Sequence, residues 1–289
     1  MKPQTSNDSR QVVINGIKLA FLEWPGERGP IICLPHLTGH KGSFINLAKR
    51  LSPTYRVIAL DLRGRGDSDK PEDGYGFAYH TRDILAFAEA RKIDQFTLIG
   101  HSFGATAATY LASIASKRVA AVALLDGGAD PKEETLRSMY PTIQRLSRVH
   151  PSLNDYLAAM QALSFHQPWS AALEQYFAED VDTLPDGSVR SKSSAAAIER
   201  DLDQHFMYSM CLHFPALRCP ALFIRPMLGL TGDKGHVFSE AEATAIVRHI
   251  PRGRRADAPE ANHYTMLIHD EPPVVEPIKN FLAEVYSVA

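Results

Sequence analysis

The residues around Ser102 have the types and order of a nucleophile. Ser102 lies in Gly100-His101-Ser102-Phe103-Gly104, between an apolar run at 96–99 and a run of small residues at 105–112. This order predicts a buried strand, one sharp turn and a helix packed against the sheet, with the serine in a strained conformation. Glycine is needed at 100 and 104 because a Cβ there would strike the neighbouring strand or the start of the helix. We therefore predict that the Ser102 hydroxyl stands at a helix N-terminus, where developing negative charge is favoured.

A serine hydroxyl is a weak nucleophile at neutral pH, so it needs a base within hydrogen-bond reach. The chain has 12 histidines, and His263 fits this role best. It follows the last strand expected, in the polar turn Pro259-Glu260-Ala261-Asn262-His263-Tyr264. The order serine, acid, histidine along the chain is also that of a serine-based triad. His101, beside the serine, is expected to pack elsewhere because adjacent side chains diverge at a tight turn.

The base in turn needs a buried carboxylate that holds its tautomer and stabilises the imidazolium. Asp126 follows the apolar run 119–125, and Gly127-Gly128 leaves room around it. Asp233 lies in Gly232-Asp233-Lys234-Gly235, after the apolar run 221–225. Either aspartate could instead bond to loop amides or to solvent. The residues alone leave both candidates open.

Attack on a carbonyl also requires donors for the oxyanion, usually two backbone N–H groups. The turn fixes one of them, the amide of Phe103. The second is expected in the loop after the apolar run 31–34, with Leu37 at the natural position. The amide does the work there, so the identity of the side chain matters little.

These residues must be positioned by a sheet, and the chain pattern predicts one. Apolar strands alternate with amphipathic helices, which is typical of a mainly parallel sheet covered on both faces. The expected strands are 11–14, 17–24, 31–34, 55–60, 96–99, 119–125, 221–225 and 254–258, and the expected helices between and after them are 44–51, 79–91, 105–116, 239–250 and 273–288. Ligands of such sheets bind beyond the carboxyl ends of the strands. The Leu37, Ser102 and Asp126 loops all lie at that edge.

A different pattern interrupts the sheet between residues 129 and 218. Four helices are expected at 135–149, 152–163, 169–179 and 194–205, and no strand alternates with them. We interpret 129–218 as a helical cap subdomain, 11–128 with 219–289 as the core, and 1–10 as a flexible tail. His36 and Trp169 are expected to contact substrate, and Tyr156, Phe165 and Phe206 either line an apolar pocket or pack within the cap.

Composition excludes several classes of function. At 289 residues with 45% hydrophobic and 22% charged residues, the chain is typical of a globular protein. A net charge of −2 gives no reason to expect a nucleic-acid or membrane partner, so we expect a small-molecule substrate; whether the chain acts alone or as a homodimer stays open. The three cysteines have no metal-ligand spacing. We expect reduced thiols, a cytoplasmic location without a signal peptide, and no cofactor or metal.

These motifs together resemble the α/β-hydrolase fold superfamily, specifically its serine hydrolases and esterases with a helical cap after the sixth strand. The resemblance covers about residues 12–288. It is carried by the serine motif, by Asp61-Leu62-Arg63-Gly64-Arg65-Gly66-Asp67-Ser68 and by Asn262-His263-Tyr264. Two features depart from the family: Pro35 and His36 replace the usual His-Gly, and the loop before Asp233 is long. Some members place the acid after the sixth strand, where Asp126 matches.

The resemblance implies a serine hydrolase that cleaves an ester or a related acyl bond of a small, fairly apolar molecule. In that reading Ser102, His263 and either Asp126 or Asp233 form the triad. Two alternatives stay open: a carbon–carbon bond hydrolase or lyase with the same triad, and a receptor-like protein that binds a ligand with negligible turnover. A dehalogenase or epoxide hydrolase is disfavoured because those members carry aspartate at the position of Ser102.

Overall fold

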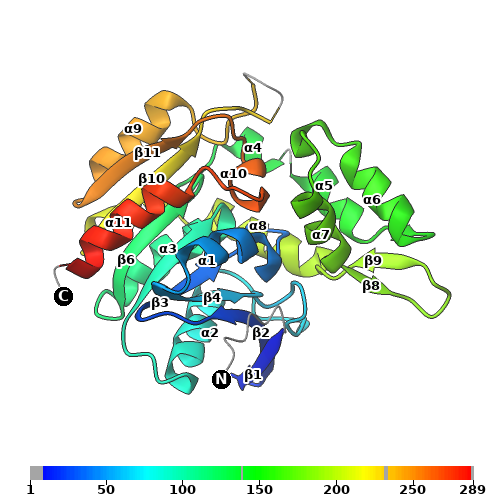
Figure 1. Cartoon of the computed structure of the whole chain (residues 1–289), viewed down its shortest axis with the longest axis horizontal. Helices are drawn as coiled ribbons and strands as arrows, with labels where there is room; N and C mark the ends of the chain where they lie inside the picture. The colour runs from blue at the N-terminus through cyan, green and yellow to red at the C-terminus, as the bar shows by residue number, and fades with distance from the viewer. Residues whose placement is uncertain (1–8, 138, 231–233, 288–289) are drawn as a thin grey trace.

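The computed structural model describes residues 9–137, 139–230 and 234–287. An eight-stranded sheet runs through the molecule in the order β1-β2-β4-β3-β5-β6-β10-β11 (Figure 1). Its strands are β1 (Arg10–Ile14), β2 (Ile17–Trp24), β3 (Arg28–Leu34), β4 (Tyr55–Leu60), β5 (Phe96–His101), β6 (Val119–Leu125), β10 (Ala221–Pro226) and β11 (Gly253–Ala258). Only β2 runs antiparallel to its neighbours β1 and β4 in this described sheet, and the other pairs are parallel. The predicted fold class is confirmed.

Helices cover both faces of the sheet because successive strand residues point to opposite sides. On one face, Ile31 and Cys33 of β3 pack with α1 (Ile45–Leu51) and α11 (Val275–Ser287). On the other, Ile32 and Leu34 pack with α2 (Phe77–Ala90), α3 (Phe103–Ile114) and α9 (Glu240–His249). Ser239 caps α9 in a capping box with Glu242. Strands buried on both faces explain the continuous apolar runs of the sequence.

The segment between β6 and β10 is helical, with one addition that the sequence reading missed. Its helices are α4 (Glu133–Arg137), α5 (Tyr140–Leu146), α6 (Leu153–Gln161), α7 (Ala171–Glu179) and α8 (Ala195–Met207). Three short strands, β7 (Val149–His150), β8 (Val181–Thr183) and β9 (Val189–Ser191), form a separate antiparallel sheet. The expectation that this segment holds no strand is therefore wrong. Asp186-Gly187 is a hairpin turn, with Gly187 at φ 85°.

The N-terminal segment, the cysteines and the lengths of the helices can be compared with the sequence-based expectations. The predicted tail 1–10 overlaps β1, which begins at Arg10, and residues 1–8 lie outside the described part. Cys33 and Cys219 are buried and Cys211 is exposed, all as free thiols. Within the described residues, every helix is too short or too polar to cross a membrane.

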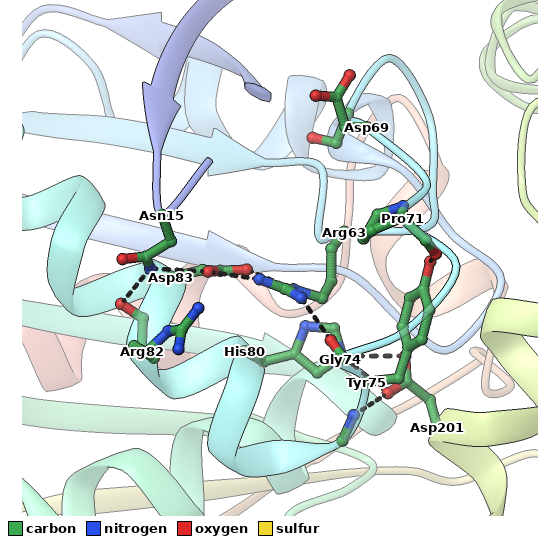
Figure 2. Close-up of polar contacts among 12 residues, drawn as sticks. Asn15, Arg63, Asp69, Pro71, Gly74, Tyr75, His80, Arg82, Asp83 and Asp201 are labelled. Atoms are coloured by element: carbon green, nitrogen blue, oxygen red, sulfur yellow. Dashed lines mark hydrogen bonds and ion pairs between the residues drawn. The ribbon is translucent and has the colours of Figure 1, made fainter. Parts of the chain in front are cut away.

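Helix α8 of the inserted segment is joined to the core by a buried carboxylate. Asp201 accepts hydrogen bonds from the His80 ring at 2.9 Å and from the Gly76 amide at 2.6 Å, and Figure 2 shows it beside His80. It also forms an ion pair at 2.7 Å with Arg65, whose side chain is fully buried. Burial raises the pKa of Asp201, but His80 and Arg65 outweigh burial and hold this pKa at about 2. The contact therefore ties α8 to the loop after β4.

We expect Asp201→Ala to destabilise the fold by about 3–5 kcal/mol, because it leaves the Arg65 charge buried and unpaired. Urea unfolding of both proteins measures this difference, and Glu199→Gln, an exposed change on the same helix, serves as the control. Because the folded pKa of Asp201 lies below its ordinary value, its stabilisation is present above about pH 4 and lost as the pH falls towards 2. An Asp201→Ala protein as stable as the Glu199→Gln control would contradict this account.

Candidate active site

The turn between β5 and α3 holds Ser102 in a strained conformation. Ser102 lies at φ 54° and ψ −118°, a region that residues with side chains rarely adopt. Its amide donates to the carbonyl of Leu125 at 2.9 Å, which joins the turn to the end of β6. A Cβ on Gly100 would lie 2.4 Å from the Gly104 carbonyl oxygen, and one on Gly104 would lie 2.2 Å from that of Leu34. The close packing expected at both glycines is therefore present.

Asp126 and His263 meet although they are far apart in the sequence. His263 Nδ1 lies 2.7 Å from Asp126 Oδ2, and both side chains are buried. Asp126 directly follows β6, and its amide donates to the carbonyl of Ile224 in the neighbouring β10 at 2.9 Å. An ionised carboxylate only accepts, so Nδ1 of a neutral His263 carries the proton. That leaves Nε2 as an acceptor.

The other candidate acid, Asp233, lies outside the described residues. Leu230, the last described residue before this gap, lines the same cavity as Ser102 and His263. The described contact with the His263 ring is made by Asp126, so the geometry favours Asp126 as the acid.

Ser102, Asp126 and His263 line one cavity of 80 Å³. Leu37 and Phe103, the residues expected to supply oxyanion donors, line the same cavity. Apolar side chains from the core and from the inserted segment form much of the remaining wall, among them Leu136, Met139, Leu202, Val237 and Phe238. The Ser102 hydroxyl has no side-chain hydrogen bond within the described part of the chain, so it can bond to a base or to a ligand. The arrangement suits nucleophilic attack on a small, partly apolar molecule.

The loop with Leu37 is held by a buried arginine that the sequence reading did not single out. Arg65 Nε donates to the Leu37 carbonyl at 2.7 Å, and the guanidinium lies 5.0 Å from the centre of the Phe103 ring. Arg65 thus contacts both residues expected to supply the oxyanion amides. Its positive charge is paired with the carboxylate of Asp201. A signal existed in the sequence, because Arg65 stands inside the Asp61–Ser68 motif, but nothing in the motif says that this side chain is buried.

His101 packs against His263 rather than away from it. Its Nε2 donates to the carbonyl of His263 at 2.8 Å, and the two ring centres are 4.7 Å apart. Burial, together with His263 and His36, lowers the pKa of His101 well below its ordinary value. His101 therefore stays neutral at pH 7 and fixes the backbone of His263.

His36 lies beside this site but faces a second cavity. Its Nε2 shares a hydrogen bond with the Tyr176 hydroxyl at 3.1 Å, and a Cβ on Gly39 would lie 2.6 Å from its ring. His36, which departs from the usual residue of the family, therefore has its ring where a side chain on residue 39 would lie. The second cavity, of 40 Å³, is also lined by Tyr264, which lines the Ser102 cavity as well.

Of the aromatic residues considered for substrate contact, some line a cavity and others do not. Trp169 stacks on Phe177 with ring centres 5.7 Å apart and lines neither cavity. Tyr156 and Phe165 line the second cavity, whereas Phe206 is exposed. Trp169 therefore packs inside the inserted segment.

Within the described residues, no group of three or more His, Cys, Asp or Glu could hold a metal ion.

Comparison with known proteins gives the same picture of the fold. A family model described as alpha/beta hydrolase fold matches residues 29–270. The N-formylmaleamate deformylase of Pseudomonas putida is 29% identical over 217 residues, which cover 74% of this chain and 76% of that protein. The 2-(acetamidomethylene)succinate hydrolase of Mesorhizobium japonicum is 27% identical over 278 residues, 95% of each chain.

A solved structure of an E-2-(acetamidomethylene)succinate hydrolase superposes with a TM-score of 0.85 at 24% identity, covering 95% of this chain and 98% of that one. The family model spans most of the chain, and the sheet order and the serine turn agree with it. The chain therefore belongs to the α/β-hydrolase fold family and is a hydrolase.

Proposed function

We propose that this hydrolase cleaves an acyl bond, an amide or an ester, of a small substrate through a covalent intermediate on Ser102. The observation that carries the proposal is the 2.7 Å contact of His263 Nδ1 with Asp126, on the wall of the cavity that Ser102 also lines. A histidine held in this tautomer presents Nε2 as a base. The positive φ of Ser102 supports its role as nucleophile.

The proposed reaction has two stages. Ser102 Oγ attacks the acyl carbon while His263 Nε2 takes the hydroxyl proton, and the amides of Leu37 and Phe103 stabilise the oxyanion. His263 then gives the proton to the leaving nitrogen or oxygen, and the bond from the acyl carbon to that atom breaks. Water next adds to the acyl carbon as His263 takes its proton. When the bond to Ser102 breaks, the proton returns to Oγ.

The named relatives favour a bond to nitrogen. Their names state action on N-formylmaleamate and on 2-(acetamidomethylene)succinate, both of which carry an acyl group on nitrogen. We extend this chemistry to the present chain as part of the proposal. The inserted segment would act as a cap, since Leu136, Met139 and Leu202 from it line the cavity with Ser102.

A fluorophosphonate probe should modify Ser102, because only an activated serine reacts readily with it. Mapping the labelled peptide by mass spectrometry identifies the residue. Ser102→Ala should lose both labelling and turnover of a panel of nitrophenyl esters and anilides, while the exposed Ser116→Ala keeps both. Labelling at a different serine, or turnover by Ser102→Ala at the parent's rate, would refute the proposed nucleophile.

Asp126→Asn should lower kcat by about 10⁴-fold, the effect of losing the correct histidine tautomer in a serine protease. The same substitution at the other candidate, Asp233→Asn, should leave kcat within a few-fold of the parent. Steady-state kinetics of both variants on one substrate makes the comparison. If Asp233→Asn is the inactive variant and Asp126→Asn the active one, the assignment of the acid is wrong.

A further inference from the structure

The second cavity is lined by a positive charge that forms no ion pair with any described residue. Arg145, on α5, lines this cavity and is half-buried. Among residues 9–137, 139–230 and 234–287, its guanidinium has neither an ion pair nor a hydrogen bond, whereas Arg65 and Arg63 of the core have buried carboxylate partners. A partly buried guanidinium without a counter-ion is costly unless a ligand supplies the negative charge.

The charge of Arg145 influences the pKa values of three ring side chains that line this cavity. Burial raises the pKa of Tyr264 and of Tyr156, and Arg145 opposes both shifts. Burial also lowers the pKa of His166 to about 4, with Arg145 acting in the same direction. The guanidinium is therefore close enough to these three side chains to influence their protons.

The histidines on the described wall add no second positive charge to that of Arg145. His36 and His166 are neutral at pH 7, since burial lowers the pKa of both. Asp180 is the acidic side chain on the described wall. Its Oδ2 accepts from the Tyr156 hydroxyl at 2.6 Å and from the Ser191 hydroxyl at 3.1 Å, while its buried Oδ1 has no hydrogen-bond partner in the described part of the chain. Burial raises the pKa of this carboxyl.

This cavity adjoins the site of the chemistry. Tyr264 lines both cavities, and His36 and Thr38, which line this one, flank Leu37 of the Ser102 cavity. The two cavities therefore share one wall residue, Tyr264, and the loop at residues 36–38.

We propose that this cavity binds the carboxylate of the substrate through Arg145, while Asp180 Oδ1 accepts an N–H or O–H of the same molecule. The substrate class is then a small acyl compound, an N-acyl compound above all, that carries a carboxylate. A planar carboxylate matches the two parallel donors of a guanidinium. A phosphate fits less well, because its larger charge would lie near Asp180 in a cavity of only 40 Å³.

This inference rests on the proposed function for its place in the reaction, but its test does not need turnover. Binding is measured by calorimetric titration of the full chain carrying Ser102→Ala, with N-acetylglycinate and with N-acetylglycinamide. The two probes have the same shape and amide N–H, and only the first carries a carboxylate. We expect N-acetylglycinate to bind about ten- to a hundredfold more tightly, the range of a charge-assisted hydrogen bond.

The preference should fall to near one in Arg145→Gln and be kept in part by Arg145→Lys, which preserves the charge but not the paired donors. The matched control is Arg148→Gln, which removes an equal charge from an exposed side chain three residues away and should keep the full preference. Equal affinities in the parent, an unchanged preference in Arg145→Gln, or a loss in Arg148→Gln would each overturn the proposal. Absence of probe labelling at Ser102 would instead overturn the proposed function and leave this result standing.

Discussion

The buried hydrogen bond between Asp126 and His263 is the contact on which the site depends. It joins the end of β6 to the loop after β11, and the parallel sheet brings these two ends to the same edge. The backbone is strained on both sides of the site, since Asp126 at φ 43° and Ser102 at φ 54° both have positive φ. Gly127 lets the two turns touch, because a Cβ there would lie 2.3 Å from the Ser102 carbonyl oxygen. The sheet therefore holds two strained turns in contact.

The inserted segment makes buried contacts with the core loops that surround the site. Asp201 of α8 neutralises Arg65, and Arg65 holds the carbonyl of Leu37. A second contact runs from the Ser193 hydroxyl to the carbonyl of Thr38 at 3.0 Å. The loop expected to bind the oxyanion is thus fixed partly by residues of the inserted segment.

Local patterns were enough to predict the sheet, the serine turn and the position of His263. Short apolar runs that alternate with amphipathic segments predict a covered parallel sheet, and the small residues after Ser102 predict a helix packed close to a strand. What depends on distant pairing could not be predicted. The choice between Asp126 and Asp233 required knowing which loop reaches His263, and the burial of Arg65 required its partner on α8. The strand pair β8–β9 was missed because each strand has only three residues.

The most direct test of the account is the protonation of the His263 ring in the resting protein. Nitrogen NMR of the chain with labelled histidine, with the His263 signals identified by their loss in His263→Gln, reports which ring nitrogen carries the proton. The account predicts a proton on Nδ1, facing Asp126, and a bare Nε2. A neutral ring with its proton on Nε2 would contradict it, because such a ring could not accept the proton of Ser102.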